Sequence, residues 1–404
     1  MFLVILLVIA YKSNDALSHP QFWAEDATIF FQQQFGHKLP QLWVPYAGYL
    51  HAIPRLVAWV ASWISITKAP LVYNAFAIVL SASAITMTCQ KLRLYVPAWV
   101  VALSCLAVPT SGEIFGTITN AQWFLQFALG ACCLSPASPR HANTLGWLRV
   151  IGILSMALTG PFSILLSIII TGMLASSWIA RKLSYDPFDG ALRSFLSERD
   201  WPALLALGLG AIIQTGVLLV APPTESATHH DLLKAINATF TELVPIHMFG
   251  NDFLTGTSWL ALYALLIGTL VLSKRIDGHA RLQVMGFAVF AILETIASAL
   301  RITDLQQIYQ PSAADRYFYL IKVVWWWVVW LALRSTGSRF RATAIVSALI
   351  CLVALNNPQF QRRAALSDFS WRDHASDLEQ PGTHTIPINP PGWSITIEAK
   401  KQQQ

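Results

Sequence analysis

Long apolar stretches follow one another along this chain, and the short segments between them carry most of its charge. A stretch of about 20 apolar residues is long enough to cross the hydrocarbon core of a bilayer as a helix. Only 12% of the residues are charged and 55% are hydrophobic, whereas soluble domains carry about 25% charged residues. The sequence therefore predicts an all-α polytopic membrane protein.

About eleven apolar stretches are candidate membrane-spanning helices. The first, residues 1–17, is short, but it lacks the basic start and the clear cleavage site of a signal peptide, so we interpret it as a span. The others lie at about residues 69–88, 92–109, 121–135, 147–158, 161–179, 201–221, 259–273, 282–300, 317–334 and 342–355.

Residues 49–66 allow two interpretations, a further span or a helix that lies flat at the membrane interface. If they do not cross, one side of the membrane holds the short loops at about 89–93, 136–149, 180–200, 274–281 and 334–341. About half of the 27 lysine and arginine residues then fall in these loops, as the positive-inside rule expects of cytoplasmic loops. We therefore expect the interfacial helix.

This topology gives the chain two parts. Residues 1–355 form a transmembrane domain with a cytoplasmic N-terminus and a long first outer loop at about 12–68. Residues 356–404 form a short extracytoplasmic tail, whose N-N-P, P-G and N-P-P-G-W sequences predict turns and short strands.

Charge and cysteine content exclude other classes. The net charge of +6 does not indicate nucleic-acid binding, because the basic residues are scattered over short loops and form no stripe. The five cysteines lie in or beside apolar stretches without a C-x-x-C pair, which predicts neither disulfides nor a cysteine metal site. His229, His230 and His247 share one outer loop, but their spacing matches no closed zinc motif.

Glu25 and Asp26 stand just after the first span, among aromatic residues. Partial desolvation raises the pKa of a carboxyl group in such a place. Such a carboxylate can deprotonate a hydroxyl group, or hold a metal ion that bridges a phosphate leaving group. The alternative is a structural role as a helix cap or a solvated loop pair.

Three further groups of polar residues fall on the predicted outer side. Tyr49 precedes His51 and Arg55, which share one face of a helix and can approach a phosphate or simply face water. The loop at 111–123 carries two glycines and polar groups that suit sugar hydroxyls, although a helix cap would also explain them. Its candidate side chains are Glu113, Asn120, Gln122 and Trp123.

The last group is Asp315, Arg316 and Tyr317. An arginine on the outer side runs against the positive-inside trend and requires a partner, which is a lipid phosphate, Asp315 or Asp304. Within the spans, Glu294 is a functional candidate because an ionisable residue inside a membrane is costly.

Several motifs, in their order along the chain, resemble the GT-C superfamily of membrane glycosyltransferases, and within it a group of bacterial membrane proteins. The motifs are W-A-E-D-A-T-I-F, Y-A-G-Y-L-H-A-I-P-R-L, N-A-Q-W-F-L, T-G-P-F-S, D-R-Y-F and the closing I-P-I-N-P-P-G-W. Ala27 departs from the W-A-E-D-G of related chains, and the short tail replaces the soluble C-terminal domain of many GT-C enzymes.

The resemblance implies an inverting transfer of a sugar from a polyprenyl-phosphate donor to an extracytoplasmic glycan or lipid acceptor, at a bacterial inner membrane. Asp26 matches the loop carboxylate that acts as base, with Glu25 as its helper or as a ligand of a divalent metal ion, Mg²⁺ or Mn²⁺. Arg316 matches the cation that holds the donor phosphate, assisted by Arg55 or Lys234.

Two other classes remain open at this point. A membrane transporter or a lipid or glycan flippase would need a polar path through the membrane, for which Glu294 and Lys322 are among the few candidates. A structural subunit of an envelope assembly would need no chemistry of its own. In each class the surrounding membrane lipids are partners, and nucleic acid is not.

Overall fold

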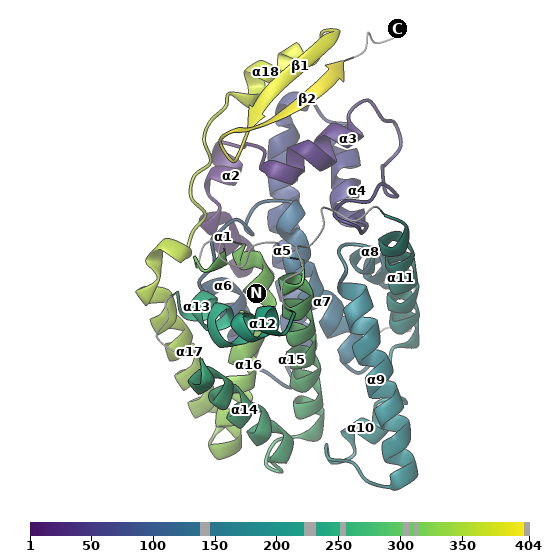
Figure 1. Cartoon of the computed structure of the whole chain (residues 1–404), viewed down its shortest axis with the longest axis vertical. Coiled ribbons are helices and arrows are strands. Elements are labelled where there is room, and N and C mark those ends of the chain that lie inside the picture. Colours follow the sequence, from purple (N-terminus) through teal and green to yellow (C-terminus); the bar gives the residue numbers. More distant parts are fainter. Residues whose placement is uncertain (138–145, 222–231, 251–255, 302–307, 311–313, 400–404) are drawn as a thin grey trace.

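The computed structural model describes residues 1–137, 146–221, 232–250, 256–301, 308–310 and 314–399. Within these ranges the chain is mainly helical and ends in a two-stranded sheet (Figure 1). The elements are α1 (Phe2–Lys12), α2 (Asp15–Ser18), α3 (Gln32–Gln34), α4 (Ala52–Ala61), α5 (Ala69–Leu92), α6 (Ala98–Ala107), α7 (Gln122–Leu134), α8 (Gly146–Ala157), α9 (Phe162–Leu183), α10 (Ala191–Ser194), α11 (Trp201–Val220), α12 (Leu232–Ala238), α13 (Val244–Phe249), α14 (Thr257–Leu272), α15 (Gly278–Ala299), α16 (Tyr319–Thr336), α17 (Arg339–Asn356), α18 (Trp371–Asp377), β1 (Gly382–Ile388) and β2 (Trp393–Ala399).

Every apolar stretch predicted as a span overlaps a helix of the structure. These helices are α1, α5, α6, α7, α8, α9, α11, α14, α15, α16 and α17. In the described part of the chain, six helices are long and apolar enough to cross a membrane: Ile66–Leu92, Phe162–Leu183, Trp201–Val220, Gly278–Ala299, Asp315–Thr336 and Arg339–Asn356. The prediction of a mostly helical membrane protein is confirmed at this level, and the count of about eleven spans stays a prediction.

Three of the long helices begin at a polar capping side chain. Asp200 at α11, Asp277 at α15 and Ser338 at α17 each accept a hydrogen bond from the backbone N–H three residues ahead. These caps satisfy backbone groups that the first turn of a helix leaves unpaired. The cap of α11 lies at the start of its apolar stretch, and the caps of α15 and α17 start those helices a few residues before theirs.

Helix α16 lies at the centre of the bundle, in contact with α6, α14, α15 and α17. The Trp327 ring packs 5.9 Å from the ring of Phe127 on α7 and 5.1 Å from that of Phe287 on α15. At the rim, α11 approaches α8 so closely that a Cβ on Gly210 would lie 2.5 Å from the Cβ of Ala157. Small residues allow such close helix contacts in membranes.

The C-terminal tail forms an antiparallel hairpin that covers one end of the bundle together with α18 (Figure 1). Its strands pair from Gly382 opposite Ala399 to Ile388 opposite Trp393. Alternate side chains point inward, as expected for a sheet with one buried face. These buried side chains are Ile386, Ile388, Ile395 and Ile397. The predicted turns and short strands are confirmed.

The tail contacts the segments on both sides of α4. The Trp371 ring packs against Phe22 and Phe31, at centroid distances of 4.7 and 5.3 Å, and its Nε1 donates to the carbonyl of Ile66 at 3.0 Å. Segments before and after α4 therefore meet one side chain at one end of the molecule. Ten residues also give only about 15 Å of helix, half the hydrocarbon core. These contacts and the shortness of α4 agree with the interfacial interpretation of residues 49–66, which stays a prediction.

Candidate functional site

Charged and aromatic side chains from distant parts of the sequence meet at the end of the bundle that the tail covers. They come from the first loop, the turn before α4, the loop before α7, the end of α15 and the turn before α16. Figure 1 shows α2, α3, α4 and the tail hairpin at this end, and α10 at the opposite end.

Glu25 contributes the carboxylate of the first loop. Its side chain is half-buried, and its Oε1 accepts a hydrogen bond from the Tyr46 hydroxyl at 3.3 Å. Desolvation and the Glu25 charge raise the pKa of Tyr46 above its usual value, while the charge of Arg316 opposes the rise. Glu25, Tyr46 and Arg316 therefore act within one electrostatic environment.

Arg316 contributes a guanidinium group that is paired but still reachable. Its Nη1 lies 3.0 Å from Oε1 of Glu113, and the two side chains are 26% and 16% exposed. The sequence left a lipid phosphate, Asp315 and Asp304 as possible partners; the observed partner is Glu113, and Asp304 lies outside the described residues. Burial raises the pKa of Glu113, and the Arg316 charge opposes that rise.

A tight turn at Tyr46–Tyr49 organises the aromatic part of the cluster. Ala47 and Gly48 adopt positive φ angles of 52° and 83°, and the backbones of Tyr46 and Tyr49 bond to each other. Arg301 donates to the Ala47 carbonyl at 2.5 Å and lies 5.4 Å from the centre of the Tyr49 ring. A second guanidinium is thereby fixed beside the turn.

His51 stacks on the Tyr49 ring, with a centroid distance of 4.7 Å. Burial lowers the pKa of His51 to about 3, and the nearby charge of Arg55 contributes a smaller part of this shift. The imidazole is therefore neutral at physiological pH. It serves the cluster as an aromatic surface rather than as a cation.

The loop before α7 folds as its glycines predict. Gly112 and Gly116 have φ angles of 80° and 71°, which suit glycine. Asn120 donates to the Glu113 carbonyl at 3.0 Å, so it holds the loop that presents Glu113. Asn120 thus has a structural role, but not the helix cap that the sequence offered as an alternative, because the helices that begin at Thr119 and Gln122 have no side-chain cap.

Trp123 and Gln122 follow on the first turn of α7, and both are buried. The Trp123 ring packs edge-on against Tyr317 at 5.5 Å, next to Arg316. Trp123 Nε1 and Gln122 Oε1 have no hydrogen-bond partner among the described residues. Buried polar groups without a partner are costly, which makes both atoms candidates for contacting a bound molecule.

Asp26 occupies a different environment from its neighbour Glu25. Its side chain is 0% exposed, and its carboxylate accepts bonds from Ile118 N at 3.0 Å, Thr119 N at 2.8 Å and Thr119 Oγ1 at 2.5 Å. Burial raises its pKa to about 6 although these hydrogen bonds lower it, and the predicted direction of the shift is confirmed. Asp26 anchors the loop before α7 to the first loop.

Asp315 also points away from the cluster, into the bundle. It lies 2.6 Å from Lys322 Nζ and 2.9 Å from His247 Nδ1, and it accepts from Ser111 N at 3.2 Å. Removing one member of a buried ion pair is strongly destabilising. Asp315 thus fixes the turn that carries Arg316. His247 belongs to this group, and His229 and His230 lie outside the described residues.

The other two predicted phosphate ligands are Arg55 and Lys234. Arg55 is 0% exposed, and its Nη2 donates to Gln33 Oε1 at 2.6 Å and to the Val44 carbonyl at 3.0 Å. It therefore stabilises the first loop rather than joining Arg316. Lys234 is exposed on α12.

The proposed divalent metal does not fit these residues. In the described part of the chain, no three histidine, cysteine, aspartate or glutamate side chains lie close enough together to hold a metal ion. Asp26 already uses both carboxylate oxygens for hydrogen bonds. Glu25 on its own is a poor site, since Mg²⁺ and related ions require several oxygen ligands.

Comparisons with protein-family models, with curated proteins and with solved structures find no match to this chain. The fold and the site therefore define only a class, a mostly helical protein with helices suited to a membrane and a polar cluster at one end.

Sequence reasoning missed one member of the cluster, Tyr46. Arg301 and Arg316 bracket one predicted outer loop, which made both arginines candidates, but the contact of Arg301 with the distant turn at Ala47 follows from no local pattern. Tyr46 stands inside the Y-A-G-Y sequence whose second tyrosine, Tyr49, was a candidate. The Ala47-Gly48 turn that brings both rings together was the available signal.

Proposed function

We propose that the protein is a glycosyltransferase that moves a sugar from a polyprenyl-phosphate donor to a hydroxyl group of an acceptor glycan or lipid. The observation that supports it is the meeting of a half-buried carboxylate, Glu25, with two guanidinium groups, Arg316 and Arg301, and aromatic rings at one end of the bundle. Such a site offers a base, a phosphate ligand and surfaces for sugar rings.

In the proposed reaction, the acceptor oxygen attacks the anomeric carbon while the bond from that carbon to the donor phosphate breaks. Glu25 accepts the hydroxyl proton. Arg316 and Arg301 bind the phosphate, which keeps the bonding electrons and gains negative charge as it leaves. Inversion follows from attack on the face opposite the phosphate. Asp26 keeps Glu25 in place by fixing the loop before α7.

This assignment gives Glu25 the role that the sequence alone gave to Asp26. The reason is access, because a carboxylate must come within hydrogen-bond reach of the proton that it abstracts. Asp26 is buried and already accepts three hydrogen bonds, whereas Glu25 is half-buried. The proposal places the site on the extracytoplasmic side of a bacterial inner membrane.

The test uses the purified protein in vesicles with a panel of radiolabelled polyprenyl-phosphate sugars and surface glycan acceptors. Glu25→Gln should lower the rate of sugar transfer by about 100-fold or more, without lowering the melting temperature. Arg316→Lys should weaken transfer because it removes the bidentate phosphate contact. Glu379→Gln, a carboxylate change at an exposed site on the tail, is the matched control.

Other outcomes identify the alternatives. Full transfer by Glu25→Gln together with loss in Asp26→Asn would return the base to Asp26. Movement of the labelled donor across the vesicle without cleavage would support a transporter or flippase. If the donor is neither cleaved nor moved by the folded protein under any condition of the panel, the glycosyltransferase proposal fails.

A further inference from the structure

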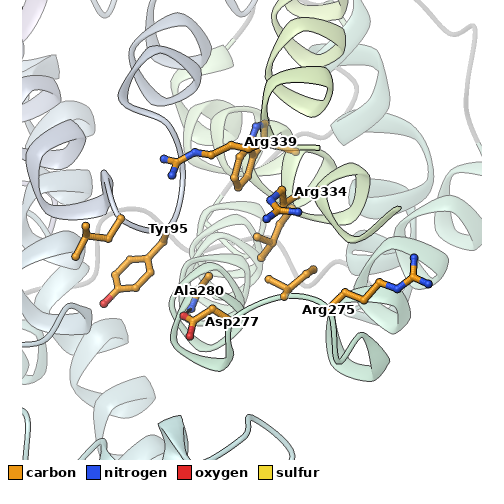
Figure 2. Close-up of a pocket in the computed structure, with 10 residues that line it drawn as sticks. Tyr95, Arg275, Asp277, Ala280, Arg334 and Arg339 are labelled. Carbon is orange, nitrogen blue, oxygen red and sulfur yellow. Dashed lines mark hydrogen bonds between the residues drawn. The ribbon is translucent and has the colours of Figure 1, made fainter. Parts of the chain in front are cut away.

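A small cavity lies at the other end of the bundle from the cluster around Glu25. It has a volume of about 140 Å³, and Figure 2 shows its lining residues. They come from the turns that join α5 to α6, α14 to α15 and α16 to α17: Leu94, Tyr95, Arg275, Ile276, Asp277, Ala280, Trp330, Leu331, Arg334 and Arg339. Arg275 precedes α15 and Arg301 follows it, so this helix of 22 residues separates the two sites by about 33 Å.

The cavity carries an excess of positive charge. Arg275, Arg334 and Arg339 pair with no acidic side chain in the described part of the chain. The acid of the lining, Asp277, uses its carboxylate to cap α15 through Ala280 N at 2.9 Å. Three arginines against one engaged carboxylate leave a site that favours an anion.

Two of the guanidinium groups are held in position by the backbone. Arg334 Nη1 donates to the Gly337 carbonyl at 3.0 Å, and Arg339 Nη2 donates to the Arg93 carbonyl at 3.3 Å. Each contact uses one of the five N–H donors of an arginine, so others stay available. Figure 2 shows Arg334 between the other two arginines, with the Arg339 guanidinium on one side of it and Arg275 on the other. Preorganised guanidinium groups are suited to bidentate phosphate binding.

The surroundings of the cavity are apolar. Trp330 and Leu331 are buried beside it, while Leu94, Leu272 and Phe340 stand 74%, 80% and 84% exposed at the ends of neighbouring helices. A soluble phosphate ester needs no such surface next to its site. A lipid does, because its acyl chains continue from the headgroup along the apolar side of the helices.

We propose that this cavity binds the phosphate headgroup of an anionic phospholipid. Its volume is about ten times what one water molecule requires, which leaves room for a phosphate group. Arg334 and Arg339 hold the phosphate oxygens, Arg275 adds charge from the side, and the acyl chains lie along Leu272 and Phe340. The turns in question are those with the basic residues that the sequence places in the cytoplasm. The site is independent of the proposed glycosyltransferase function.

The test measures binding of phosphatidylglycerol and phosphatidylcholine to the purified full-length protein by native mass spectrometry. Arg334→Gln combined with Arg339→Gln should weaken phosphatidylglycerol binding by about tenfold to thirtyfold. Phosphatidylcholine binding should fall less, because its choline cation offsets the charge of the same phosphate group. Arg334→Lys combined with Arg339→Lys should lose less, because it keeps the charge and gives up only the bidentate geometry.

The matched control removes two charges from the same face, with Lys182→Gln and Arg341→Gln, which do not line the cavity. It should change phosphatidylglycerol binding by less than about twofold. An equal loss in the control would overturn the proposal in favour of a general charge effect. Displacement of the lipid by millimolar inorganic phosphate alone would overturn the lipid assignment and leave a soluble phosphate as the ligand.

Discussion

At the scale of single residues, the neighbours Glu25 and Asp26 have different tasks because successive residues at the start of a helix point in different directions. Glu25 meets the Tyr46 hydroxyl in the cluster, and Asp26 meets the backbone of Ile118 and Thr119 inside the fold. The same burial that gives Asp26 its structural role also makes it sensitive to pH.

Asp26 and His51 should change the stability of the protein in opposite directions as the pH rises. The pKa of Asp26 is raised from 3.8 to about 6, so the folded chain holds this proton more tightly, and the free energy of unfolding falls by about 3 kcal/mol across that window. The pKa of His51 is lowered from 6.5 to about 3, so between those values the free energy of unfolding rises, by about 5 kcal/mol at most.

Thermal melts of the purified protein between pH 4 and pH 6.5 check this prediction. In His51→Gln the melting temperature should fall as the pH rises, because the destabilising ionisation of Asp26 is then no longer offset by the titration of His51. Asp26→Asn should leave a melting temperature that rises more steeply than in the parent chain. Parallel curves for the two variants would contradict the opposed shifts of these two groups.

The sequence predicted part of this site. It placed Glu25, His51, Glu113, Arg316 and Tyr317 among the candidates, because acids, arginines and aromatics near a membrane surface need a reason to be there. It did not predict that Glu113 pairs with Arg316, since 203 positions separate them along the chain (316 minus 113). Tertiary structure alone supplies such a pairing.

At the scale of elements, the tail and the first loop form one unit. Besides the Trp371 contacts, Gln32 Nε2 donates to the Thr396 carbonyl at 2.9 Å, and Asn389 bonds to both Phe22 and Ala24 through its backbone. The I-P-I-N-P-P-G-W motif therefore serves to fix the loop that carries Glu25. Its turn residues predicted a local bend, but they contained no information about the docking partner.

Trp371→Ala should loosen this unit. Loss of a buried tryptophan costs about 3–5 kcal/mol, and Trp371 is 3% exposed between Phe22 and Phe31. Limited proteolysis should then cut the tail faster, and the melting temperature should fall. Trp393→Ala is the control, because Trp393 belongs to the same tail and is 44% exposed. Equal sensitivity of the two variants would show that the Trp371 contacts do not hold the tail.

At the scale of the whole molecule, apolar length and charge distribution made the helices predictable, because a bilayer accepts few other structures. Every apolar stretch became a helix, although several ends moved, as α6 shows by covering only Ala98–Ala107 of the expected 92–109. The arrangement of the two ends was harder to foresee. It depends on contacts such as that of Trp371 with Ile66, which no local pattern contains.

The predicted membrane topology can be tested by cysteine labelling. Leu39 in the first loop and Thr385 on β1 are exposed at the covered end, and Tyr185 after α9 is exposed elsewhere in the chain. Single cysteines are introduced at these positions after replacement of Cys351, the exposed native thiol, while the four buried cysteines are kept. A membrane-impermeant maleimide on intact cells should label Leu39→Cys and Thr385→Cys, and should reach Tyr185→Cys only after permeabilisation.

Labelling of Leu39→Cys and Thr385→Cys from opposite sides would mean that α4 crosses the membrane. Labelling of all three from outside would reverse the expected side of the basic loops, and with it the cytoplasmic placement of the proposed phospholipid site.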